Sequence, residues 1–169
     1  FGSCRQTPDS AIAAGLDYAV FLATSTGRRV VTNLSLGEVP TSLADTCASI
    51  LNTSVNSALA NNVVVVAAAG NYLVPDSAVG KAVMCPARIP GVIAVGALDP
   101  GGVVCDYSAR GPQLAVTAPG DYITSLSHVG GYKQLSGTSM AAPFIAGLAA
   151  LLVSAKPAAS TQTVTSLIE

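Results

Sequence analysis

Apolar residues recur along the chain with two different spacings, and these predict helices and strands in turn. In residues 9–25 they stand three and four positions apart, the spacing of an amphipathic helix with Asp9 or Ser10 as its N-cap. Gly27 follows where a glycine commonly ends a helix. Residues 42–62 predict a second long helix.

Other apolar runs predict strands. The run 63–71, VVVVAAAGN, is apolar without alternation, which is typical of a parallel strand covered on both faces. Further strands are expected at 29–37, 91–98 and 113–120, a third helix at 137–154, and a last helix at the final SLIE. Helices that alternate with apolar strands predict an α/β domain with a mostly parallel sheet and right-handed crossovers. Sites in such sheets form at the carboxyl ends of strands.

Composition narrows the class of protein. The 169 residues suffice for one compact domain, half of them are apolar, and only 10% are charged. A net charge of −1 without a basic run argues against nucleic acid as a partner. The longest apolar runs, 63–69 and 146–153, are shorter than the ~18 to 20 residues that span a bilayer, so no membrane partner is expected. No secretion signal opens the chain, so any such signal lies upstream or is absent.

The stretch LSGTSMAAPFIAGLAALL, residues 135–152, places Ser139 at the start of the third predicted helix. Backbone N–H groups at a helix N-terminus favour negative charge, so Ser139 can be a nucleophile whose oxyanion meets these donors. On local grounds alone, Thr138 or Ser139 is more simply a helix cap, with Pro143 in the first turn. A serine of the α/β-hydrolase kind is excluded, because that class needs Gly-x-Ser-x-Gly and the fifth position here is Ala141.

GTSMAAPFIAGLAALL resembles the nucleophile motif of the subtilisin-like serine proteases, the subtilases. VVTNLSLG, VVVVAAAGN, PGVIAVGALD and DYSARGPQLAVTAPG are similar to further segments of this family, in the family's order. The resemblance implies a three-layer α/β/α fold with a mostly parallel sheet, incomplete at both ends. It identifies residues 1–169 as a single partial catalytic domain that, in its parent protein, hydrolyses peptide bonds through an acyl-enzyme.

The resemblance assigns roles to residues at the predicted strand ends. Ser139 takes the place of the nucleophile, and Asn71 that of the side-chain donor of the oxyanion hole; an asparagine after a glycine is also typical of a left-handed turn. The segment that pairs with an extended substrate corresponds to Ser35, Leu36 and Gly37. The floor of the primary specificity pocket corresponds to Ala67, Ala68, Ala69 and Gly70. These small residues imply a pocket open to a medium or large apolar side chain, although a buried strand against a helix also uses alanine.

The family's aspartate and histidine motifs have no counterpart in this sequence. The one histidine, His128, follows the strands in SLSHVGGYK and is expected in a turn or surface loop. Three hypotheses follow. In the first, the chain is part of an active protease whose Asp and His lie on an absent N-terminal segment, so that this chain alone is inactive. In the second it is a catalytically dead scaffold that binds peptides or proteins, and in the third it is an unrelated α/β domain in which Ser139 only caps a helix. The joint presence of Ser139 and Asn71 favours the first, since a binding module needs neither.

The four cysteines fit no metal or redox spacing, and by themselves leave disulfides and buried thiols open. Some subtilases hold a disulfide that corresponds to Cys47 and Cys85, which leaves Cys4 and Cys105 to each other or to the absent segment. The resemblance further implies a secreted, extracellular protein that acts on peptide or protein substrates and has a propeptide.

No resident metal or cofactor is expected. One calcium site of the family uses two backbone carbonyls and an aspartate. Pro90 and Val92 correspond to the carbonyl positions, but Ala115 stands in place of the aspartate. Because calcium prefers several hard oxygen ligands, any calcium site of the parent protein at this place is expected to be weak or absent.

Overall fold

The computed structural model describes residues 8–71 and 78–169. The elements in chain order are α1 (Asp9–Thr26), β1 (Val31–Leu34), α2 (Ser49–Ala60), β2 (Val64–Ala68), β3 (Ile93–Leu98), β4 (Val116–Pro119), β5 (Ile123–Leu126), β6 (Tyr132–Leu135), α3 (Thr138–Ala155) and α4 (Thr161–Ile168). Strands β1 to β4 form a sheet in that order with every pair parallel, and β5 and β6 form an antiparallel hairpin. The predicted α/β class with a parallel sheet is confirmed.

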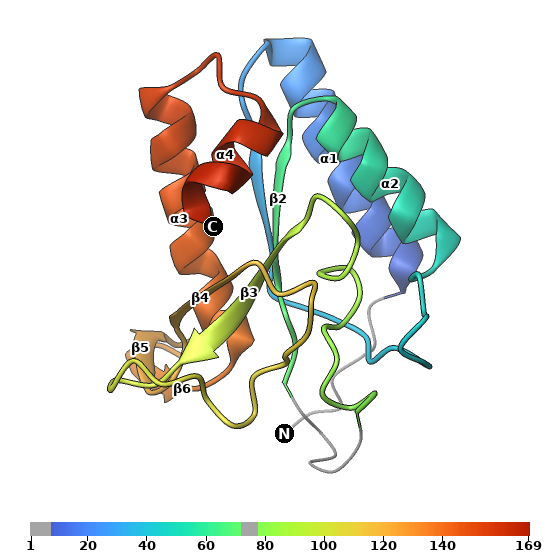
Figure 1. The fold of residues 1–169 in the computed structure, drawn as a ribbon. Coiled ribbons are helices and arrows are strands. Elements are labelled where there is room, and N and C mark those ends of the chain that lie inside the picture. Colours follow the sequence, from blue (N-terminus) through green and yellow to red (C-terminus); the bar gives the residue numbers. More distant parts are fainter. Residues whose placement is uncertain (1–7, 72–77) are drawn as a thin grey trace.

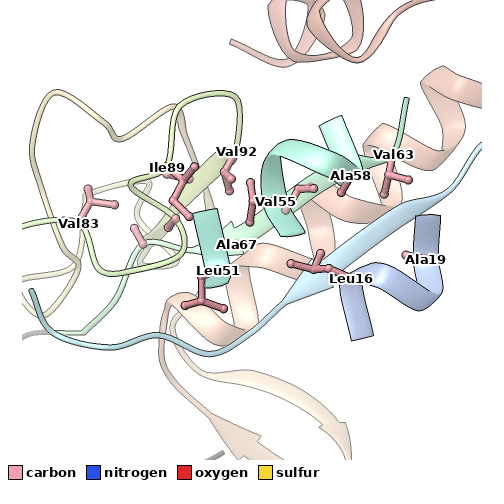
Figure 2. Close-up of a cluster of buried hydrophobic side chains, with 14 of the residues drawn as sticks. Leu16, Ala19, Leu51, Val55, Ala58, Val63, Ala67, Val83, Ile89 and Val92 are labelled. Carbon is pink, nitrogen blue, oxygen red and sulfur yellow. The ribbon is translucent and has the colours of Figure 1, made fainter. Parts of the chain in front are cut away.

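Helices cover both faces of the sheet, with α1 and α2 on one side and α3 and α4 on the other (Figure 1). Strand β2 is buried throughout, and its side chains alternate between two cores. The core beneath α1 and α2, part of which Figure 2 shows, takes Val63, Val65 and Ala67. The core beneath α3 and α4 takes Val64, Val66 and Ala68. Burial on both faces explains why this run is apolar without alternation.

Helix α2 begins at Ser49, later than the predicted residues 42–62. The Asp45 carboxylate prevents an earlier start, because it accepts hydrogen bonds from the Thr41 N–H and hydroxyl and from the Cys47 N–H, each at 2.8 Å. Cys47 itself has a φ of 66°, which no helix allows. The hydrogen bonds from Thr41 and Cys47 to the carboxylate also lower the pKa of Asp45 below its ordinary 3.8.

The ends of α1 confirm one sequence prediction and correct another. Gly27 ends the helix in the left-handed conformation, with φ 66°, as predicted. The N-cap is Pro8, without a side-chain hydrogen bond, and not Asp9 or Ser10. Asp9 instead lies in the first turn, where the positive end of the helix dipole favours a carboxylate.

Two further differences lie in the C-terminal half. The β5–β6 hairpin was not predicted, because its strands are short and β6 is exposed throughout and so lacks a clear apolar period. Helix α4 is longer than the final SLIE and begins after Ser160, whose Oγ accepts a hydrogen bond from the Thr163 N–H at 3.1 Å. Helix α3 is long and apolar enough to cross a membrane by length and composition, but it packs against β1 to β4, which is the position of a core helix.

A disulfide joins Cys47 to Cys85, as the family resemblance implies, with an S–S distance of 2.05 Å. It connects the turn before α2 to the segment around Cys85. The backbone of Cys85 in turn pairs with that of Glu38 through two hydrogen bonds, of 2.9 and 3.0 Å. Cys105 is a buried free thiol. Cys4 lies outside the described residues.

Candidate active site

The predicted site residues meet where β1 and β2 end and α3 begins. Ser35 directly follows β1, Asn71 comes three residues after β2, and Ser139 is the second residue of α3. Because β1 and β2 are parallel, their carboxyl ends lie at the same edge of the sheet. Direct hydrogen bonds then connect both strand ends to the start of α3.

Ser139 and Ser35 are linked by two reciprocal hydrogen bonds. The Ser35 hydroxyl donates to the Ser139 carbonyl at 2.8 Å, and the Ser139 hydroxyl donates to the Ser35 carbonyl at 3.2 Å. Pro143 lies inside α3, beyond the first turn in which it was predicted. A proline has no N–H, so Pro143 cannot donate the helical hydrogen bond to the carbonyl four residues earlier, which is that of Ser139. This explains the first bond. Ser35 therefore satisfies the carbonyl that the proline leaves without a helical donor.

Asn71 is held by Thr138, the residue before Ser139. The Asn71 Oδ1 accepts hydrogen bonds from the Thr138 N–H at 2.9 Å and from the Thr138 hydroxyl at 3.1 Å. The same hydroxyl, in a side chain that is 1% exposed, accepts the Gly70 N–H at 3.1 Å. Since an N–H and an O–H both donate to this atom, it is the amide oxygen, which leaves the NH₂ as the donor end of the Asn71 side chain.

Two glycines give the site its close contacts. Gly137, the N-cap of α3, has a φ of 153°, and a Cβ on it would lie 3.1 Å from the Asn71 Nδ2. Gly70 has a φ of 113°, and its carbonyl accepts the Ala109 N–H at 2.9 Å. Asn71 also forms a backbone bridge with Ser108, which is fully buried. The Asn71 side chain thus packs against the start of the helix, and its backbone is paired with Ser108.

The geometry contradicts a simple capping role for Thr138 and Ser139. The N-cap is Gly137, and no side-chain cap bond forms at this end of α3. The Thr138 hydroxyl points instead to Gly70 and Asn71. Thr138 thus holds Asn71 in place, a contact that was not predicted from the sequence; the available signal was a hydroxyl side chain directly before the candidate nucleophile.

The predicted substrate segments differ in exposure. Ser35 and Gly37 are exposed, Leu36 is half-buried, and all three follow β1, the edge strand of the four-stranded sheet. Along Ala67 to Ala69 every residue is buried, and the side chains enter the two cores, as in a buried strand against helices. No side chain of Ala67, Ala68 or Ala69 is therefore exposed to a substrate.

His128 is exposed in the turn between β5 and β6, as expected. The Ser139 hydroxyl donates to a backbone carbonyl, which cannot accept its proton in a reaction.

Tyr107, near the site segment, has a structural contact: its hydroxyl donates to the Gly120 carbonyl at 3.0 Å. Burial, followed by a hydrogen bond with Cys105, raises the pKa of Tyr107 above its ordinary value.

Pro90, Val92 and Ala115 line one cavity of about 310 Å³. Its described lining includes one carboxylate, Glu169, and the guanidinium-bearing Arg88. Among the residues that the structure describes, no cluster of three or more His, Cys, Asp or Glu could hold a metal ion. The Arg88 guanidinium donates to the Ser42 and Leu43 carbonyls, so among the side chains of this lining only Glu169 offers a carboxylate, fewer hard oxygen ligands than calcium prefers.

Comparison with known proteins agrees with this arrangement. A profile of the subtilase family matches residues 2–169. Subtilisin DY of Bacillus licheniformis is 40% identical over 151 residues, which cover 89% of this chain and 50% of that protein. The thermostable alkaline protease of Halalkalibacterium halodurans is 36% identical over 149 residues, 88% of this chain and 36% of that protein. The chain thus spans half or less of the length of these relatives.

Solved structures give the same result. A cold-adapted subtilisin-like serine proteinase superposes with a TM-score of 0.80 and 29% identity over 97% of this chain and 55% of that one. Sphericase superposes with a TM-score of 0.81 and 30% identity over 96% of this chain and 55% of that one. With the family profile, the sequence relatives and the fold in agreement, the chain belongs to the subtilase family of serine proteases.

Proposed function

We propose that the parent protein, meaning the protein that carries this chain, is a subtilisin-type serine endopeptidase. Ser139 attacks the carbonyl carbon of a peptide bond and forms an acyl-enzyme, which water then hydrolyses. The oxyanion of each tetrahedral intermediate is met by the Asn71 NH₂ and the Ser139 N–H. The observation that carries this proposal is the fixed Asn71 amide, whose oxygen is held by both donors of Thr138.

We infer that the general base and its orienting carboxylate come from outside these 169 residues, so that this chain alone is inactive. Two observations support this: the Ser139 hydroxyl donates to the Ser35 carbonyl, and His128 is exposed in a hairpin turn. Helix α3 also presents exposed apolar side chains, with Phe144 50%, Leu148 41% and Leu151 70% exposed. Exposed apolar side chains of this kind make the isolated chain prone to aggregate.

The second candidate is a catalytically dead scaffold that binds peptides or proteins. The exposed segment Ser35–Gly37 at the edge of the sheet favours it, because an extended peptide can pair with such an edge. This candidate leaves the hydrogen bonds around Asn71 without a purpose. For both candidates we propose a peptide or protein as partner, and for the protease also a propeptide and a secreted, extracellular location.

Hydrolysis by the parent protein distinguishes the two candidates. A peptide p-nitrophenyl ester should give a burst of one product per active site, because an activated ester acylates the serine faster than water hydrolyses the acyl-enzyme. Ser139→Ala should abolish both the burst and turnover. Ser136→Ala is the matched control, since Ser136 is an exposed serine nearby whose Oγ accepts the Tyr122 N–H. Peptide binding without hydrolysis by the folded parent protein would refute the protease and support the scaffold.

A further inference from the structure

Met84 lies between the two segments that the proposed function assigns to the substrate. Its backbone N–H donates to the Ala69 carbonyl at 2.8 Å, so it runs beside the end of the pocket strand. The next residue, Cys85, pairs with Glu38, directly after the edge segment. Residues 84 and 85 therefore connect the pocket floor to the edge that binds the substrate backbone.

The Met84 side chain occupies the space between these segments. A Cβ placed on Gly70 would lie 2.4 Å from the Met84 Cγ and 2.5 Å from its Sδ. A Cβ placed on Gly37 would lie 3.2 Å from the Met84 Cβ and 3.6 Å from its Sδ. The thioether thus packs on the bare backbone of a glycine on each side. Only 6% of the residue is exposed.

We propose that Met84 determines the specificity of the site by filling the pocket for the residue before the scissile bond. The pocket then favours small residues such as alanine, glycine or serine over phenylalanine and tyrosine. This inference rests on the proposed protease function. It replaces the expectation of a pocket open to medium or large apolar side chains. That expectation was based on the small residues Ala67–Gly70 alone and did not include Met84, which packs against Gly70.

The exclusion has a steric basis. A large substrate side chain would have to displace a thioether that already contacts two backbones, and forcing additional atoms into a filled space moves side chains off their preferred rotamers. Methionine is flexible, so the exclusion is graded and not absolute. Differences of one methylene in a pocket change kcat/KM by about 10- to 200-fold, so a whole ring should cost at least about tenfold.

The test uses the parent protein and two peptide p-nitroanilides that differ only in having alanine or phenylalanine before the scissile bond. The wild type should favour alanine in kcat/KM by about tenfold or more, and Met84→Gly should shift the ratio toward phenylalanine by about tenfold or more. Val83→Ala is the matched control. It removes part of the neighbouring side chain, which is fully buried in the core beneath α1 and α2, and should leave the ratio unchanged.

Labelling of Ser139 by a fluorophosphonate, read by intact mass, separates failure of the function from failure of this inference. Labelled protein that prefers phenylalanine, or whose ratio does not respond to Met84→Gly, overturns the role of Met84 alone. Folded parent protein that is neither labelled nor active overturns the protease and this inference with it. If Met84→Gly does not fold, the kcat/KM ratio of the wild type and the change of this ratio in Met84→Ala still test the role of Met84.

Discussion

Replacing Thr138 by valine tests whether its hydroxyl holds the oxyanion donor. Valine has nearly the same shape as threonine but has no hydroxyl. The substitution removes the bond to the Asn71 Oδ1 at 3.1 Å and the acceptor of the Gly70 N–H, also at 3.1 Å. The Thr138 N–H still donates to Asn71, so the amide is loosened and not released. Thr138→Ser keeps the hydroxyl and is the matched control.

The magnitude follows from the burial of these groups. The Gly70 N–H is left buried without its partner, which costs about 1 to 3 kcal/mol of unfolding free energy. The lost bond to Asn71 adds about 0.5 to 1.5 kcal/mol. Thr138→Val should therefore lower the stability by about 1.5 to 4.5 kcal/mol, whereas Thr138→Ser retains both hydrogen bonds and should lose much less.

Two assays on the parent protein separate stability from function. Urea unfolding gives the free-energy difference, and kcat for a peptide p-nitroanilide, measured well below the unfolding midpoint, reports on the oxyanion site. We expect kcat to fall by about tenfold in Thr138→Val, less than on complete loss of an oxyanion donor. Equal kcat in the valine and serine variants, or a Thr138→Val variant as stable as the wild type, would show that the Thr138 hydroxyl does not hold the oxyanion donor.

Three further predictions concern neighbouring features. Asn71→Ala should lower kcat by about 100- to 1000-fold with little change in KM, the figure that holds for subtilisin itself, and a loss below about tenfold would contradict its role. Serine at both Cys47 and Cys85 should lower the unfolding free energy by about 4 kcal/mol, because the disulfide closes a loop with a sequence separation of 38; an unchanged urea midpoint would oppose this. Asp45 has a folded pKa below its ordinary 3.8, so its stabilising effect is present above pH 3.8 and lost as the pH falls through the folded pKa. The difference in urea midpoint between wild type and Asp45→Asn should shrink in that acid range, and a constant difference would show that Asp45 does not act through its charge.

The architecture was predictable because burial leaves a clear pattern in the sequence. Strand β2 contributes side chains to cores on both faces, and its unbroken apolar run shows this directly. The start of α2 was not predictable from periodicity. It depends on the hydrogen bonds of one carboxylate, that of Asp45, which hold the preceding turn. The β5–β6 hairpin is mostly exposed and therefore has no apolar signal.

For the site, the motifs predicted which residues meet but not how they are held. Ser139 and Asn71 were named from the family resemblance, while the contribution of Thr138 needs the distances to Asn71 and Gly70. The role of Ser35 as partner of the Ser139 carbonyl follows only once Pro143 is placed inside the helix. Such contacts join residues far apart in the sequence, so no local pattern reveals them.

We propose Ser139 as a nucleophile that a base outside these residues activates. The most direct measurement is fluorophosphonate labelling read by intact mass, on the folded parent protein and on the isolated 169-residue chain. We expect one label on Ser139 in the parent protein, no label in Ser139→Ala, an unchanged label in Ser136→Ala, and no label on the isolated chain. An unlabelled parent protein would contradict the nucleophile, and a labelled isolated chain would contradict the external base.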